Sequence, residues 1–252
     1  MSATVNYWND AKCAKAFWSQ GEMPAYSRLL DDTIAWTDPA PGQTWLDLGC
    51  GGGRLARALW HKAQGKLGRV IALDLAETNR RAIVRLAAEL RTERIEFRQG
   101  NLSEGLPGFE PCSLDGVVSG LAIQYAEHFC EQTGRWTRQA YEHLLAEVHR
   151  TLRPGGTFVF SVNVPRPAWL RLSLSGVLGA FRAGKPIRYV ENTWRMLRYG
   201  AWLKREAKRG RFHYLPEQTV WECLLRAGFA DVDVRTSYAG LAYVFRASRP
   251  LP

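Results

Sequence analysis

Short apolar runs alternate with amphipathic stretches through most of the chain. Five runs have the length and composition of strands: TWLDLG (44–49), RVIALD (69–74), IEFRQG (95–100), LDGVVSG (114–120) and TFVFSVNV (157–164). Between them, residues 55–59, 79–91 and 137–152 carry apolar side chains at helical spacing. Alternation of strand and helix predicts a parallel, doubly wound α/β sheet.

Helices and strands are also predicted at both ends of this pattern. Tyr26, Leu29, Leu30 and Ile34 have helical spacing before the breaker segment TDPAPGQ. Residues 216–228 form a second helical pattern, with Gly228 at its cap, and DVDVR and LAYVFRA then read as two short strands. We expect an N-terminal helical cap (1–40), a ligand-binding domain (41–165 and 213–252) and a helical insertion (166–212).

Composition excludes several classes of protein. The chain has 252 residues, 46% of them hydrophobic, which suits one well-buried domain. It has no apolar run long enough to span a membrane, and MSATVNYWNDAK lacks the features of a secretory signal. The five cysteines lie far apart without the spacing of metal ligands, so we expect reduced thiols, no metal site and a cytoplasmic location.

The positive charge is concentrated in the insertion. Residues 166–212 contain twelve Lys and Arg but only two acidic residues, and this excess equals the net charge of +10 for the whole chain. The remainder is neutral by count. The basic charge is therefore a local feature that requires a local explanation.

A glycine-rich loop follows the first predicted strand. The stretch DLGCGGGR (47–54) lacks the Lys-Ser or Lys-Thr of a phosphate loop, and Arg54 stands where a dinucleotide fingerprint needs Gly or Ala. Asp47 would repel a pyrophosphate at this place and attract a cation. Asp74, at the end of the second strand, suits a pair of ribose hydroxyls because a carboxylate only accepts hydrogen bonds. S-adenosylmethionine combines a ribose with positive charge and has no phosphate.

Five motifs in order carry a family resemblance. DLGCGGG (47–53), Asp74 in ALDLAE, GNLSEGLP (100–107), LDGVVSG and LRPGGTFVFSV (152–162) resemble the successive motifs of class I S-adenosylmethionine-dependent methyltransferases. Within that superfamily the sequence is most similar to the small-molecule branch with the ubiquinone/menaquinone-type enzymes. The resemblance covers residues 41–165 and 213–247. It implies a Rossmann-like, seven-stranded sheet whose last strand is antiparallel.

The resemblance also implies a set of cofactor-binding residues. Asp47 and the loop after it shape the methionyl pocket, Asp74 binds the ribose and Leu75 lies against the adenine. Asn101 stands where the family usually has Asp for the adenine amino group, and its carbonyl can still accept that bond. Ser119 to Leu121 line the floor beneath the sulfonium. The full set is Tyr7, Trp8, Asp47, Gly49, Cys50, Gly51, Gly53, Asp74, Leu75, Asn101, Leu102, Ser119, Gly120 and Leu121. Tyr7 and Trp8 either fold over the cofactor or form a hydrophobic staple under the sheet.

Two groups of residues are candidates for catalysis. Tyr125 and His128 follow the fourth strand, near the expected position of the transferred methyl group, and an exposed loop histidine is the alternative reading of His128. His213 and Tyr214 lie where the insertion rejoins the core. Methyl transfer from a sulfonium needs chiefly a well-placed acceptor and exclusion of water, so a base is required only if the acceptor keeps its proton.

The insertion has three interpretations. Two amphipathic helices, near residues 170–181 and 190–201, place Arg195, Arg198, Arg205 and Arg209 on a face of their own. The segment is either a lid with solvated charges, a surface for an anionic membrane, or an RNA-binding surface. Tryptophans among the arginines favour the membrane over RNA. We expect a small-molecule methyltransferase, and the alternatives are a noncatalytic S-adenosylmethionine-binding regulator and an RNA methyltransferase.

Overall fold

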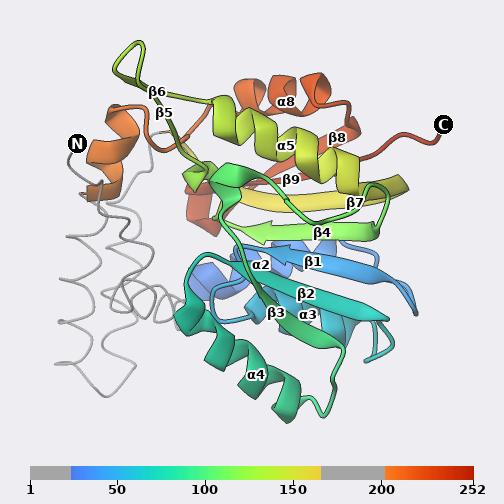
Figure 1. Ribbon diagram of the computed structural model, residues 1–252. Coiled ribbons are helices and arrows are strands. Elements are labelled where there is room, and N and C mark those ends of the chain that lie inside the picture. Colours follow the sequence, from blue (N-terminus) through green and yellow to red (C-terminus); the bar gives the residue numbers. More distant parts are fainter. Residues whose placement is uncertain (1–23, 166–201) are drawn as a thin grey trace, which may run out of the picture.

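The computed structural model describes residues 24–165 and 202–252, and its core is a seven-stranded sheet (Figure 1). In chain order the strands are β1 (Thr44–Leu48), β2 (Arg69–Asp74), β3 (Ile95–Gln99), β4 (Leu114–Gly120), β7 (Leu152–Asn163), β8 (Ala230–Ser237) and β9 (Ala242–Ser248). Their spatial order is β3-β2-β1-β4-β7-β9-β8. The first five are parallel, and β9 is antiparallel to both of its neighbours, which confirms the predicted antiparallel last strand.

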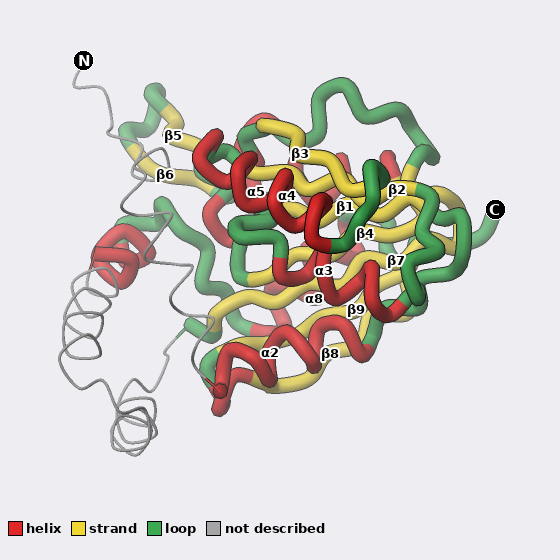
Figure 2. The backbone as a smooth tube through the Cα atoms, turned by 90° about the horizontal axis from the view of Figure 1, so that it is seen from below, coloured by secondary structure: helices red, strands yellow, loops and turns green. Residues whose placement is uncertain are grey.

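Helices cover both faces of this sheet. One face packs against α2 (Pro24–Ala35), α3 (Arg54–Lys62) and α4 (Arg80–Glu89), which contribute Leu29, Leu59 and Ile83 to one apolar cluster. The other face packs against α5 (Gln139–Thr151) and α8 (Glu217–Arg226), through Leu144 and Leu224. Figure 2 shows the same helices and strands from below. The sheet is therefore the middle of three layers.

Short helical turns and a hairpin occupy the loops. The turns are η3 (Glu77–Asn79), η4 (Leu102–Glu104), η5 (Ile123–Tyr125) and η6 (Tyr238–Gly240). The hairpin pairs β5 (His128–Cys130) with β6 (Arg135–Thr137) and is absent from the sequence prediction. Residues 202–208 are also helical. Figures 1 and 2 both place this helix and the hairpin on one side of the molecule, the side to which the β4 arrow points in Figure 1.

The strand ahead of the insertion is longer than predicted. Instead of beginning at residue 157, β7 begins at Leu152, directly after α5, and runs through the Pro-Gly-Gly segment. Leu152 pairs with Leu114, and the register then shifts before Gly116 pairs with Thr157. Arg249 holds the junction between α5 and β7, because its guanidinium donates to the carbonyls of residues 149, 150 and 152. A side chain close to the C-terminal end of the sequence thus stabilises the start of β7.

Candidate functional site

The glycine loop after β1 is held between two neighbouring loops. The backbone amides of Gly49 and Cys50 both donate to the carbonyl of Leu73, at 2.8 and 2.9 Å. Gly49 has φ +77°, and a Cβ built on it would lie 2.3 Å from Cβ of Ala122, in the loop after β4. Only glycine fits this close approach without displacing backbone. The loop therefore has a fixed position at the carboxyl ends of β1, β2 and β4.

Gly51 faces open space. Its φ is +49°, and a Cβ built there would meet no atom of the described residues within 4 Å. Its amide donates to Oδ2 of Asp74 at 2.8 Å. Gly53, by contrast, abuts α4, since its Cβ would lie 2.6 Å from Ile83. The two glycines thus have different surroundings, and the exposed backbone at Gly51 is the one a ligand can approach.

Asp74 is fixed by main-chain donors. Its Oδ1 accepts the amide of Ala76 at 2.9 Å and its Oδ2 accepts Gly51. Burial raises the pKa of this carboxyl, and the hydrogen bonds from Ala76 and Gly51 act in the opposite direction. The side chain of Asn79 and the backbone of Leu75 also hydrogen-bond to this carboxyl and lower its pKa. The end of β2 therefore presents an oriented acceptor next to the open side of Gly51.

Asp47 is a buried carboxylate without a counter-ion among the described residues. It is 1% exposed, its Oδ2 accepts the amide of Ala56 at 2.9 Å, and its Oδ1 has no partner there. Burial raises the pKa of Asp47 to about 7, the Ala56 hydrogen bond lowers it, and the charge of Asp74 raises it again. No described Lys or Arg forms an ion pair with either aspartate. Such an oxygen fits a cationic ligand.

Other predicted cofactor residues are engaged in local structure. Asn101 caps η4, accepting the amide of Ser103 at 3.1 Å while its amide group donates to Glu104. Ser119 donates its hydroxyl to the carbonyl of Leu48 at 2.7 Å, which ties β4 to β1. Both side chains thus position backbone.

Five further predicted residues lie at the end of β4 or in the loops around these strands. Leu121 has φ +53° and donates its amide to the Ser161 carbonyl. Gly120 lies close to α3, since a Cβ on it would be 3.2 Å from Leu55. Cys50 is buried, and burial raises the pKa of its thiol. Leu75 directly follows β2, and Leu102 is the first residue of η4. Tyr7 and Trp8 lie outside the described residues. We call Asp47, Gly49–Gly53 and Asp74–Ala76 the donor site.

Two predicted catalytic tyrosines, far apart in the sequence, lie next to each other in the structure. The hydroxyls of Tyr125, in η5, and Tyr214 lie 3.3 Å apart. Burial raises the pKa of both phenols. The ring of Phe212 packs edge-on against Tyr125, with the centroids 5.0 Å apart. His128 lies elsewhere, in β5, where its Nδ1 pairs with the hydroxyl of Thr137 at 2.8 Å.

His213 is buried beside this pair. It is 4% exposed, and its ring Nε2 has no partner among the described residues. Burial lowers the pKa of His213 to about 4, a backbone hydrogen bond with Ala126 acts in the opposite direction, and the charge of Arg138 lowers the pKa further. The imidazole is therefore neutral at physiological pH. Its backbone amide donates to the Gln124 carbonyl at 2.9 Å.

Gln124 joins three segments in this region. Its side chain is fully buried, accepts the amide of Asn163 at 2.7 Å and donates to the carbonyl of Leu121 at 3.4 Å. Together with the His213 contact, these bonds connect the loop after β4 to the end of β7 and to the return of the chain from the insertion. The sequence analysis did not predict this role of Gln124.

A buried ionic network was also missed. Arg211 forms a two-pronged ion pair with Glu127, and its Nη1 lies 3.6 Å from Glu206. The side chains of Arg211 and Glu206 are 5% and 6% exposed. The Arg211 guanidinium also lies 5.0 Å from the Trp136 ring centroid. This network fastens residues 202–215 to residues 124–138, and we call these two segments the acceptor region.

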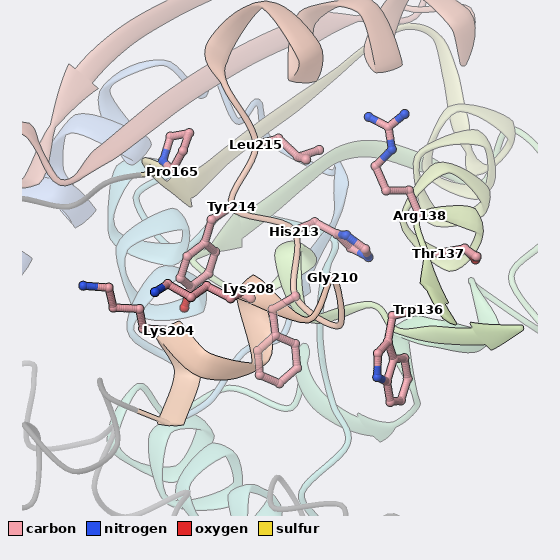
Figure 3. A pocket seen from close by; sticks show the side chains of 12 residues that line it. Trp136, Thr137, Arg138, Pro165, Lys204, Lys208, Gly210, His213, Tyr214 and Leu215 are labelled. Atoms are coloured by element: carbon pink, nitrogen blue, oxygen red, sulfur yellow. The ribbon is translucent and has the colours of Figure 1, made fainter. Parts of the chain in front are cut away.

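A pocket of about 680 Å³ opens within the acceptor region (Figure 3). Its walls come from β6 and the start of α5, from the end of β7 and from the returning chain: Trp136, Thr137, Arg138, Pro165, Lys204, Ala207, Lys208, Gly210, Phe212, His213, Tyr214 and Leu215. This volume lies in the usual range for small-molecule sites.

The structure leaves part of the insertion prediction untested. Arg195, Arg198 and the two predicted helices lie outside the described residues. Arg205 and Arg209 are described, and both are exposed and form ion pairs with Glu206. The lid and the contact with an anionic membrane stay predictions.

No group of three or more His, Cys, Asp or Glu side chains in residues 24–165 and 202–252 is arranged to hold a metal ion. None of the helices described there is both long and apolar enough to cross a membrane.

Comparison with known proteins decides the family of the core. A family model described as a methyltransferase domain matches residues 46–160, from β1 to β7. Residues 46–160 form a class I S-adenosylmethionine-dependent methyltransferase domain. The resemblance inferred from the sequence is thereby confirmed, and the strand order of the sheet agrees with it.

Relatives of the methyltransferase domain come from several kinds of protein. The chain is 33% identical over 156 residues to the biotin biosynthesis bifunctional protein BioHC of Teredinibacter turnerae, covering 56% of this chain and 25% of that protein. It is 27% identical to a ubiquinone biosynthesis O-methyltransferase of Xanthomonas campestris, covering 69% and 64%. The match thus spans less than two thirds of either relative.

A solved structure supports the fold. An S-adenosylmethionine-dependent methyltransferase from Aquifex aeolicus superposes with a TM-score of 0.59 at 14% identity, over 94% of this chain and 97% of that one. At this identity the likeness concerns the fold alone.

Proposed function

We propose that this protein transfers the methyl group of S-adenosylmethionine to a small-molecule acceptor with an apolar body. The observation that carries the proposal is Oδ1 of buried Asp47, which no described residue satisfies, at the mouth of a loop with open space beside Gly51. S-adenosylmethionine brings positive charge to this position. The name of the Xanthomonas relative refers to ubiquinone biosynthesis, which supports an apolar acceptor.

The residues of the donor site have separate tasks in this proposal. Asp47 stabilises the positive charge, and Asp74, oriented by the amides of Gly51 and Ala76, accepts the ribose hydroxyls. Bound S-adenosylmethionine supplies a methyl group on a sulfonium, which is itself the leaving group. The protein therefore needs to align the acceptor and exclude water, tasks that rigid strand ends and buried walls perform.

The acceptor region supplies the other half of the proposal. Tyr125, in η5, and Tyr214 form a partly buried polar pair, and neutral His213 adds a ring nitrogen that has no partner among the described residues. A neutral imidazole nitrogen accepts a hydrogen bond from a hydroxyl or an amine of the acceptor. These groups orient an acceptor rather than activate it strongly, because burial makes His213 a weak base.

The test is Asp47→Asn, with Asp115→Asn as a matched control. The first substitution keeps an oxygen for the Ala56 amide and removes only the charge, so S-adenosylmethionine should bind about ten- to a hundredfold more weakly by calorimetry. Asp115 also accepts a backbone amide, that of Thr44, but lies at the opposite end of β4, so its variant should bind normally.

Two outcomes would count against the proposal. Unchanged affinity in the Asp47 variant would remove the role of this carboxylate. Tight binding without release of S-adenosylhomocysteine across a broad acceptor panel would instead support the noncatalytic regulator, so the panel is assayed on the same protein preparation.

A further inference from the structure

The pocket in the acceptor region has an unbalanced charge. Among the described residues that line it are Lys204, Lys208 and Arg138, and none of these described residues is an Asp or Glu. Arg138 has a partner in Glu142, at 3.8 Å, whereas neither lysine forms an ion pair with any described carboxylate. The nearby acids, Glu206 and Glu127, are already held by Arg211. The pocket therefore offers two positive charges that no described carboxylate compensates.

Both lysines belong to one wall. They are four residues apart in the helix over residues 202–208, a spacing that places two side chains on the same helix face. Figure 3 shows both extending to the same side of the pocket. The opposite part of the wall is apolar, with the Trp136 and Phe212 rings and Leu215. An occupant thus meets charge on one side and apolar surface on another.

His213 points to a ligand independently of the lysines. This residue lines the pocket, is 4% exposed and leaves its Nε2 without a partner among the described residues. Leaving a buried polar atom unbonded is costly, so such atoms usually serve a ligand or an ordered water. Because the ring is neutral, it suits a hydrogen-bond donor rather than a second anionic group.

We infer that this pocket binds an acceptor made of an apolar body, a carboxylate or similar anionic group held by Lys204 and Lys208, and a hydroxyl or N–H group that donates to His213. The inference rests on the proposed methyl transfer and names the class of its acceptor. The Tyr214 hydroxyl connects the pocket to Tyr125 at the end of β4, so the anion anchors the acceptor beside the donor site.

The test uses two acids and their uncharged counterparts. Binding of 4-hydroxyphenylacetate and 3-(4-hydroxyphenyl)propanoate is measured by calorimetry with S-adenosylhomocysteine present, and compared with the two primary amides. The acids should bind at least about tenfold more tightly than the amides. Lys204→Gln with Lys208→Gln should remove this preference and leave amide binding unchanged.

The control variant removes the same number of positive charges from the same segment. Arg205→Gln with Arg209→Gln also removes two positive charges, but neither arginine lines the pocket, so the preference for acids should persist. Equal binding of acids and amides, no binding of either, or equal loss in both double variants would overturn the inference. S-adenosylmethionine affinity, measured separately, should be normal in both variants; its loss in Asp47→Asn alone tests the proposed function.

Discussion

The donor site and the acceptor region are held together in different ways. In the donor site, polar side chains bond to backbone amides, and the chain segments involved lie within 30 residues of one another. In the acceptor region, segments more than 60 residues apart meet through an ionic network, aromatic rings and the hydrogen bond from the His213 amide to the Gln124 carbonyl. The donor site thus follows from the fold itself, whereas the acceptor region depends on particular side chains.

This difference predicts how each site responds to substitutions. Backbone amides at strand ends are present whatever the neighbouring side chains are, so the donor site tolerates changes around it. Replacing one partner of a buried ion pair destabilises the protein, because the remaining charge stays buried without compensation. We therefore expect substitutions in the acceptor region to alter stability and acceptor binding while S-adenosylmethionine affinity is retained.

The largest effect is expected for Arg211→Met. It leaves Glu127 and Glu206 without their buried cation, and removal of one partner from such a network costs about 3–5 kcal/mol. The control Arg57→Met breaks an exposed pair with Glu89 and should cost less than about 1 kcal/mol. Urea unfolding compares the two. Equal stability of both variants would show that the network does not hold the acceptor region.

The second prediction uses pH to contrast the two sites. The folded-state pKa of Asp47 is raised from 3.8 to about 7, so its contribution to stability is lost as pH rises between about 4 and 7. The folded-state pKa of His213 is lowered from 6.5 to about 4, so stability is lost as pH falls through that window. In the wild-type protein the two slopes oppose one another.

Single variants should therefore expose the opposite slopes. Relative to wild type, Asp47→Asn should lose about 3 kcal/mol between pH 7 and 4, and His213→Gln should gain a similar amount. Free energies of unfolding measured across this range provide the check. Curves parallel to the wild type would mean that neither group titrates as its burial dictates.

The smallest effect concerns two glycines in similar conformations. Gly51 and Gly42 both have positive φ, and a Cβ on either meets no described atom within 4 Å, so alanine at each should cost about 1–2 kcal/mol of stability. Only Gly51→Ala should weaken S-adenosylmethionine binding, by about tenfold or more, because its Cβ enters the space proposed for the cofactor. Calorimetry on both variants decides, and equal affinities would place the cofactor elsewhere.

The sequence predicted the donor side of the molecule closely. Strand β2 occupies residues 69–74 as expected, and Asp47 and Asp74 end up at neighbouring strand ends because parallel strands end on one edge. The hairpin was missed because strands of three residues, such as His128–Cys130, are too short for an alternating pattern. Its turn residue Gly134 was the one local signal.

The acceptor region was predicted only in pieces. Tyr125 and Tyr214 were separate candidates, and nothing in local spacing indicates that residues 89 positions apart share a hydrogen bond. Arg211 belonged to a basic segment whose charges were expected to face outward, yet it is 4% exposed. Its burial depends on Glu127 and Glu206, and such long-range pairing is not encoded in periodicity.

The two contacts of Gln124 affect how the insertion of this protein can change in length and sequence. The chain leaves the core near Asn163 and returns at His213, and both ends are fastened to this one residue. The free energy of closing a loop between fixed ends rises by only about 0.6 kcal/mol for each doubling of its length. Changing the length of the chain between Asn163 and the helix at residue 202 therefore adds little closure cost, which makes residues 166–201, ahead of the Arg211 network, the natural place to graft a new substrate range onto an unchanged donor site.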